Sequence, residues 1–162
     1  MKISKYLQEQ LNSFGATTKL SRTTDTYVSL ENRAKAANDW GANIFCSVHI
    51  NAGGGTGIET WKHDNASSFV TKLASRVQST LIRDLGVTDR KVKSCPSQRG
   101  GSNIYVIDPK NTRAWAILPE IMFIDTSSDA DKLKKEDFLK KAGYAIAWGI
   151  RNFVENDVPT TN

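Results

Sequence analysis

Asn43-Ile-Phe-Cys-Ser-Val-His-Ile-Asn-Ala52 is the stretch around which the rest of the chain is arranged. Residues 44–48 are mostly apolar and rich in β-forming types, and they lie between the breaker Gly41 and a glycine run, so they predict a short buried strand. His49 follows this strand directly, with Asn51 and the run Gly53–Gly55 after it. An imidazole at the carboxyl end of a strand, beside a glycine-rich loop, is well placed to bind a ligand or a metal ion. His49 is one of only two histidines in the chain, which gives it unusual weight.

Helices and strands alternate on both sides of this stretch. The patterns predict helices over 2–14, 29–40, 65–85 and 136–154, and strands over 16–20, 57–62, 104–107 and 114–123, with a basic loop over 87–101. We therefore expect a single-domain three-layer α/β fold, with a mixed, mostly parallel sheet and helices on both faces. The domain is placed at 1–156 and a short tail at 157–162. Functional residues of such sheets tend to lie just beyond the carboxyl ends of strands, where we expect His49 and Glu120.

Composition is typical of a soluble globular protein of one domain, with 39% apolar and 24% charged residues in a chain of 162. No apolar run is long enough to span a membrane, and the first residues lack the pattern of a signal peptide. A net charge of +5 suits a polyanion such as nucleic acid, a membrane surface or an anionic wall polymer. Nucleic acid is the weakest of these because no basic helix stands out. Cys46 is expected in the core and Cys95 in a loop, and no disulfide is expected between them.

Glu120 is the second residue with a chemical signal. It lies inside the apolar run Ile117-Leu-Pro-Glu-Ile-Met-Phe123, where burying a carboxylate is costly unless it is paired or used. Desolvation would raise its pKa, as a general acid or base requires. The alternative is a glutamate at a strand end that faces solvent. For His49 the alternatives are a metal ligand, because neutral imidazole presents a lone pair, and a histidine that only bonds the backbone.

Two other groups are given a structural interpretation. His63 stands beside Lys62 and Asp64, and we expect it at the surface. The charges of Arg22, Asp25, Arg33 and Arg90 are expected to be solvated by default, with ion pairs that hold loops as the alternative. A separate hypothesis is that the basic loop over 90–99 binds an anionic ligand in a small α/β hydrolase or binding domain.

Several motifs together resemble one known family. They are Ser21-Arg22-x-x-Asp25, Leu30-x-x-Arg33-x-x-x-Ala37-Asn38, the opening stretch up to Ala52, Gly57-Ile-Glu-Thr60, Asp89-Arg90-x-Val92-Lys93 and Pro119-Glu120-Ile-Met-Phe123-Ile-Asp. In this order, over nearly all of residues 1–155, the pattern resembles the zinc-dependent N-acetylmuramoyl-L-alanine amidases of the type-3 family.

The resemblance implies a function at the bacterial cell wall. Enzymes of this family cleave the amide bond between N-acetylmuramic acid and L-alanine, using Zn²⁺ held by two histidines and a glutamate, and a separate catalytic glutamate. Transferred by position, His49 is similar to the last zinc histidine and Glu120 to the catalytic glutamate. Asn51, Arg90 and Ser102 are expected to contact substrate, with loops 53–55 and 99–103 bordering it. The implied partners are the glycan strand and stem peptide of peptidoglycan, with no nucleic acid, and a phage lysin or a domain of a secreted hydrolase both fit.

The chain departs from the family at its amino end. The family's first zinc histidine lies in a turn after an amino-terminal strand, and its zinc glutamate opens the first helix, whereas this chain starts inside what resembles that helix. The zinc site is therefore expected to be incomplete. Three hypotheses remain open: an amidase that has lost its amino-terminal segment, a relative that binds peptidoglycan without cutting it, and a partner chain that supplies ligands. A homodimer could also cover the strand left exposed.

Overall fold

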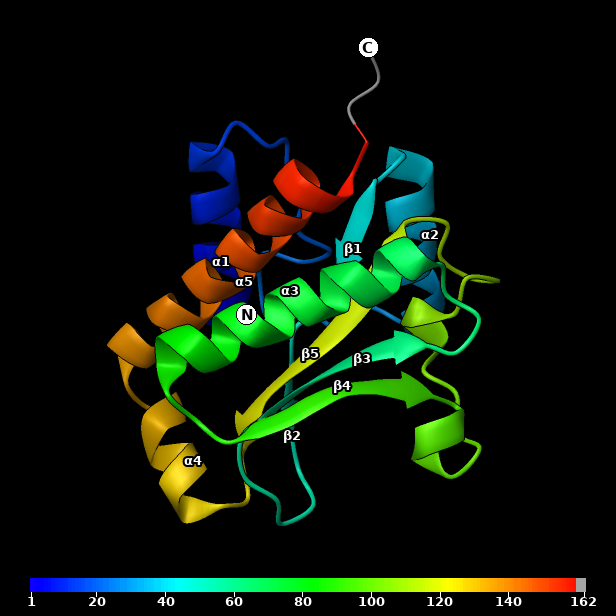
Figure 1. Ribbon diagram of the computed structural model, residues 1–162. Helices are drawn as coiled ribbons and strands as arrows, with labels where there is room; N and C mark the ends of the chain where they lie inside the picture. Colours follow the sequence, from blue (N-terminus) through cyan, green and yellow to red (C-terminus); the bar gives the residue numbers. More distant parts are fainter. Residues whose placement is uncertain (160–162) are drawn as a thin grey trace.

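A five-stranded mixed sheet forms the centre of the computed structural model, which describes residues 1–159 (Figure 1). Strand β5 (Trp115–Phe123) lies in the middle of the sheet. On one side it pairs in parallel with two short strands, β1 (Ile44–Cys46) and β2 (His49–Asn51). On the other side it pairs antiparallel with β3 (Ile58–His63), which pairs in parallel with β4 (Asp89–Cys95). The expected mixed, mostly parallel sheet is confirmed.

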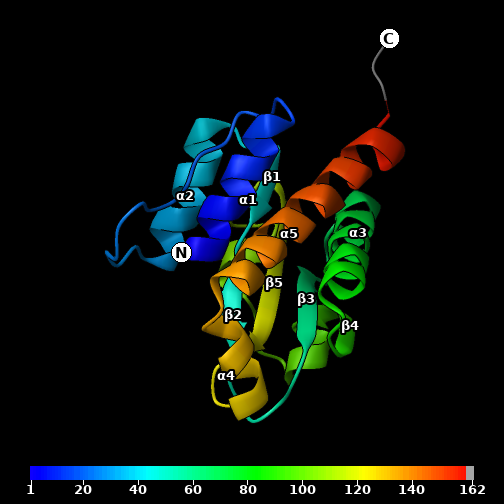
Figure 2. The same ribbon diagram turned by 90° about the vertical axis from the view of Figure 1, so that its left-hand side faces the viewer.

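Three long helices cover one face of this sheet. They are α1 (Lys2–Ser13), α3 (Ser68–Leu85) and α5 (Glu136–Asp157), and Figure 2 shows α5 lying between the other two. Helix α2 (Leu30–Trp40) packs against a short 3-10 helix, η2 (Tyr105–Ile107), and α4 (Ser127–Leu133) follows β5. A second 3-10 turn, η1 (Ser97–Arg99), follows β4. The helices flank the sheet as the α/β prediction requires. Among the described residues, none of these helices is long and apolar enough to span a membrane.

The alternation of side chains along the strands produces two hydrophobic clusters. Ile58, Ile117 and Ile121 point to the long helices and belong to the larger cluster. Trp61 and Leu118 point to the opposite face and form a smaller cluster with residues of η2. Because side chains alternate along a strand, Glu120 lies on the same face as Leu118. We call this the η2 face of the sheet.

Several expected elements differ from the structure. Residues 16–20 are not a strand, residues 104–107 include η2 in place of a strand, and the basic loop over 87–101 contains β4. The sequence did not predict strand β4 because Asp89-Arg-Lys-Val-Lys-Ser-Cys95 is mostly polar, as an edge strand can be. The polar segment after β5 contains α4. The domain boundary at 156 stays a prediction: α5 ends at Asp157, and residues 160–162 of the expected tail lie outside the described part.

Candidate active site

His49 and Glu120 lie opposite each other on neighbouring strands. His49 of β2 is the partner of Glu120 of β5 in the strand register. Paired residues of adjacent strands place their side chains on the same face of the sheet, so both point to the η2 face. The expectation that they lie beyond strand ends is wrong. The opening strand breaks at Ser47 and Val48 and resumes as β2, so His49 is inside the sheet, and Glu120 lies within β5.

The surroundings of His49 favour the neutral form of its imidazole. Its Nε2 lies 3.1 Å from Oγ of Ser47, a hydroxyl that is itself buried. Burial lowers the pKa of His49, and the positive charge of Arg33 lowers it further. A neutral imidazole keeps one nitrogen lone pair available, either for a metal ion or for a hydrogen bond.

Glu120 carries the clearest chemical signal in the molecule. Its Oε2 is the one buried side-chain nitrogen or oxygen among residues 1–159 that has no hydrogen-bond partner. Burial raises the pKa of Glu120 to about 7, the charge of Glu59 adds to this, and the charge of Arg99 opposes it. A carboxyl group with this pKa is divided between its two protonation states near neutral pH. It can therefore accept and return a proton during a reaction.

A second carboxylate, Glu59 of β3, lies on the other side of Glu120. The two residues are partners in the antiparallel β3–β5 register, and Glu59 is only 4% exposed. Both of its oxygens are occupied: Oε1 accepts from Asn51 Nδ2 at 3.1 Å and from Trp61 Nε1 at 3.0 Å. Oε2 bonds Arg90 Nε and Lys93 Nζ, each at 2.7 Å. Burial acts to raise the pKa of Glu59, but the bonds from Lys93 and Arg90 outweigh it and hold the pKa below its usual value.

Sequence reasoning did not single out Glu59 as a site residue. The available signal was weaker than for Glu120, because only Ile58 and Trp61 are apolar in the strand Ile58-Glu-Thr-Trp-Lys-His63. Arg90, for which solvation was the default expectation, is instead one of the ion-pair partners of Glu59. Asn51, which was expected to contact substrate, donates a hydrogen bond to the carboxylate of Glu59.

The glycine loop after β2 is fixed by the segment that follows β5. The backbone N–H groups of Gly53 and Gly54 donate to Oδ2 of Asp125, at 2.6 and 3.0 Å. Asp129, which is buried, accepts from the hydroxyl of Thr56 and from the backbone N–H of Gly57. The loop thus has a defined position next to the end of β5.

Other residues from the sequence analysis lie elsewhere. Ser102 is exposed, and its backbone N–H donates to the carbonyl of Arg99, so its expected contact with substrate stays a prediction. The expectation that His63 lies at the surface is wrong: it is 4% exposed, and its Nε2 lies 3.8 Å from Asp108 Oδ2. Cys95, expected in a loop, is fully buried at the end of β4 and has a free thiol. Both are covered by the segment that contains η2.

A catalytic zinc ion usually has three protein ligands. Residues 1–159 contain no group of three or more histidine, cysteine, aspartate or glutamate side chains arranged to hold a metal ion. His49 can supply one ligand, and its lowered pKa suits that role, but the described residues do not form a zinc site by themselves. We therefore assign no step to a metal.

Comparison with known proteins identifies the family. The family model described as N-acetylmuramoyl-L-alanine amidase matches residues 1–152. The chain belongs to this amidase family. It is 38% identical over 136 residues to the sporulation-specific N-acetylmuramoyl-L-alanine amidase of Bacillus subtilis (strain 168), a match that covers 84% of this chain and 50% of that protein. It is 34% identical over 157 residues to an endolysin of Bacillus phage SPP1, covering 93% and 55%. The chain thus spans about half the length of these amidase-family relatives.

Solved structures of the amidase family have the same fold. The N-acetylmuramoyl-L-alanine amidase from Clostridium difficile 630 superposes with a TM-score of 0.82 at 30% identity, over 97% of this chain and 82% of that one. Cwp6 from Clostridium difficile superposes with a TM-score of 0.86 at 28% identity, over 94% of this chain and 24% of that one.

Proposed function

We propose that the protein hydrolyses the amide bond between the lactyl group of N-acetylmuramic acid and L-alanine in peptidoglycan. The observation that carries the proposal is the buried, unpartnered Oε2 of Glu120, opposite His49, in a member of the amidase family. The substrate would be the glycan strand and stem peptide of the bacterial cell wall, with no role for nucleic acid.

Glu120 is assigned both proton transfers. As a carboxylate it takes a proton from water as the water oxygen attacks the lactyl carbonyl carbon. As a carboxylic acid it then gives that proton to the nitrogen of L-alanine, which leaves as a free amine. A pKa of about 7 makes both steps accessible near neutral pH, and such catalysis typically contributes about 10²- to 10⁴-fold to a rate.

His49 contributes a neutral imidazole next to the reacting atoms. We keep it as a proposed zinc ligand, since family resemblance implies Zn²⁺ and its pKa is lowered. Two further ligands would be needed, and residues 1–159 contain no group of three such side chains arranged to hold a metal ion. Neither the proposal for Glu120 nor that for the substrate depends on a homodimer, which stays a prediction.

The test uses purified bacterial cell walls and the full chain. Hydrolysis at the proposed bond releases new amino termini that are identified as L-alanine, without new reducing sugar ends. Glu120→Gln should still sediment with walls but release L-alanine termini about 10²- to 10⁴-fold more slowly. Glu31→Gln, at an exposed position of α2, should behave like the parent. Walls that stay intact with the parent protein, while sedimentation persists, would support the alternative of a wall-binding protein without hydrolytic activity.

A further inference from the structure

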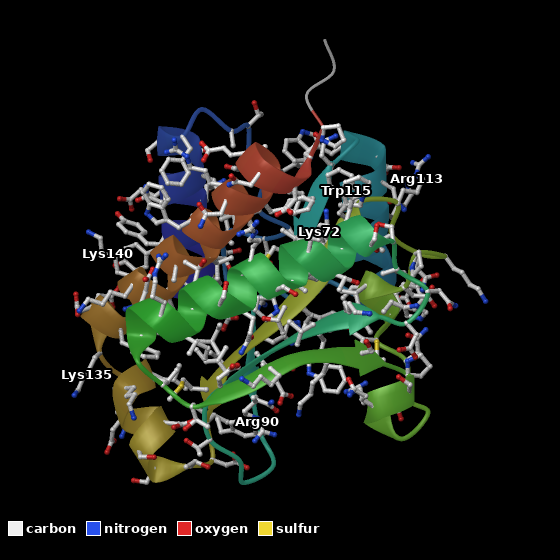
Figure 3. All side chains as sticks on the ribbon, viewed as in Figure 1. Lys72, Arg90, Arg113, Trp115, Lys135 and Lys140 are labelled. Carbon is white, nitrogen blue, oxygen red and sulfur yellow. The ribbon has the colours of Figure 1, made fainter. Side chains whose placement is uncertain are left out.

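The guanidinium group of Arg90 is fixed on two sides. Its Nε donates to Glu59 Oε2 at 2.7 Å, and its Cζ lies 4.8 Å from the centroid of the Phe123 ring. The ring lies against Gly55, where an added Cβ would be only 2.6 Å from Phe123 Cζ. Figure 3 shows Arg90 at the start of β4, above the loop that joins β2 to β3. A cation so placed loses little further freedom when it binds a ligand.

The outer edge of this guanidinium is not used within the protein. Among residues 1–159, Arg90 donates only through Nε, and no residue accepts from either terminal nitrogen. The side chain is 31% exposed, so part of it lies at the protein surface. Parallel N–H groups on the two terminal nitrogens match the two oxygens of a carboxylate.

The local charge favours an anion. Arg90 and Lys93 share the single negative charge of Glu59, which leaves one positive charge in excess. Arg99 lies near enough to act on Glu120, and it adds to the positive potential. Lys93 also stacks over the Trp61 ring, with Nζ 5.6 Å from the centroid, so it too has a defined position.

The distance from Glu120 fits the substrate. Strands β5, β3 and β4 are consecutive in the sheet, which separates the backbones of β5 and β4 by about 10 Å. In an extended stem peptide, the second residue lies within about 7 Å of the start of L-alanine. The α-carboxyl group of that residue extends further, so a stem peptide is long enough to place it at Arg90 when the scissile amide lies at Glu120.

We propose that Arg90, held by Glu59 and Phe123, binds the α-carboxylate of the second residue of the stem peptide and so favours wall peptides whose carboxylate is free over those in which it is amidated. This inference rests on the proposed function, because it takes the stem peptide as the ligand. It adds a specificity residue and the chemical group that this residue recognises.

Binding without turnover tests the inference. The probes are two synthetic muramyl tripeptides in which the second residue is a glutamate joined to the third through its side-chain carboxyl group, so that its α-carboxyl group is not used in the chain. One has a carboxylate and the other a carboxamide at that position, and each is titrated calorimetrically into the full-length Glu120→Gln protein. The carboxylate ligand is expected to bind about tenfold or more tightly than the carboxamide ligand, as charge-assisted hydrogen bonds imply. Adding Arg90→Gln should bring this ratio close to one, with most of the loss in affinity for the carboxylate ligand.

Two further variants make the result specific. Lys91→Gln removes the same charge at the adjacent position, where the side chain is 78% exposed and pairs with Asp89, and should leave the ratio unchanged. Arg90→Lys keeps a cation for Glu59 but loses the paired donors, so it should lower the ratio several-fold even if Arg90→Gln fails to fold.

The inference is overturned if the ratio is near one before any change at Arg90, if it survives Arg90→Gln or Arg90→Lys, or if Lys91→Gln abolishes it as well. Absence of binding by both ligands also overturns it. Failure of the proposed function appears separately, as a parent protein that releases no L-alanine termini from cell walls while the binding ratio is intact.

Discussion

Glu59 and Glu120 are partners on adjacent strands, yet their surroundings are opposite. Glu59 receives four donors on its two oxygens, and its pKa is held low. Glu120 has a buried oxygen without a partner and a pKa raised to about 7. The same side chain on the same face of one sheet is therefore a fully paired anion at one position, and at the other a carboxyl group that is divided between its two protonation states near neutral pH.

The difference originates on the neighbouring strands. Glu59 of β3 lies beside β4, which supplies Arg90 and Lys93. Glu120 of β5 lies between Glu59 and β2, where the partner in register is His49, an imidazole that burial keeps neutral. A carboxyl group between a negative charge and a neutral ring is stabilised in its protonated form. Pairs of acids whose pKa values are driven apart are typical of acid–base catalysts.

The largest expected effect is on the rate of hydrolysis, where replacing Glu120 should cost far more than replacing Glu59. Glu120→Gln should lower the rate of L-alanine release by about 10²- to 10⁴-fold, because it removes the group that carries the proton. Glu59→Gln should cost about tenfold, chiefly in KM, because no oxygen of Glu59 is free to touch substrate and its loss acts through Arg90. Initial rates on cell walls of the two variants, with Glu31→Gln as control, measure both effects. A loss with Glu59→Gln as large as that with Glu120→Gln would contradict the assignment.

For the free energy of unfolding the order of the two substitutions is reversed, and replacing Glu59 should cost more than replacing Glu120. Glu59→Gln leaves Arg90 and Lys93 without their anion and should lower the free energy of unfolding by about 2–3 kcal/mol. The value is kept below that of a fully buried pair because both cations are partly exposed. Urea titration at pH 7 gives the change, and Glu31→Gln should stay within about 0.5 kcal/mol of the parent. A Glu59→Gln protein as stable as the parent would show that the ion pairs contribute nothing.

The pH dependence of stability sharpens the contrast. Because burial raises the pKa of Glu120 from 4.5 to about 7, the folded protein keeps a proton that the unfolded chain has released, and stability falls as pH rises through this range. Glutamine has no such proton. Glu120→Gln should therefore gain on the parent by roughly 1–3 kcal/mol between pH 4.5 and pH 8, after allowance for partial exposure. Unfolding midpoints at several pH values measure this gain, and a constant difference would contradict the raised pKa.

The sequence could predict the parts of the structure that depend on local patterns. The helix expected over 29–40 is α2, and at its start the Ser29 hydroxyl accepts from the Asn32 N–H, as N-cap residues do. The apolar run around Glu120 is β5, and the cost of burying a carboxylate there pointed to the residue whose oxygen has no partner.

The remaining features depend on contacts between distant segments. Strand β4 is polar in sequence and becomes a strand by pairing with β3. The same cost of burial applied to Glu59, but only the fold shows that Arg90 and Lys93 meet its charge. The charged neighbours of His63 predict that it lies at the surface. It is buried because the segment around Asp108 covers the end of β3.

The smallest expected effect tests whether the glycine loop keeps Arg90, the ion-pair partner of Glu59, in position. An alanine Cβ at Gly55 would lie 2.6 Å from Phe123 Cζ and 2.7 Å from Cε1, so the ring under Arg90 must move. Gly55→Ala should cost about 1–2 kcal/mol in the free energy of unfolding and lower the preference for a stem carboxylate. Gly54→Ala is the matched control: φ is +73° but no atom lies within 4 Å of an added Cβ, so it should cost about 1 kcal/mol of backbone strain without changing the preference. Equal changes in preference for the two variants would mean that Phe123 does not set the position of Arg90, and that Glu59 alone holds the guanidinium group.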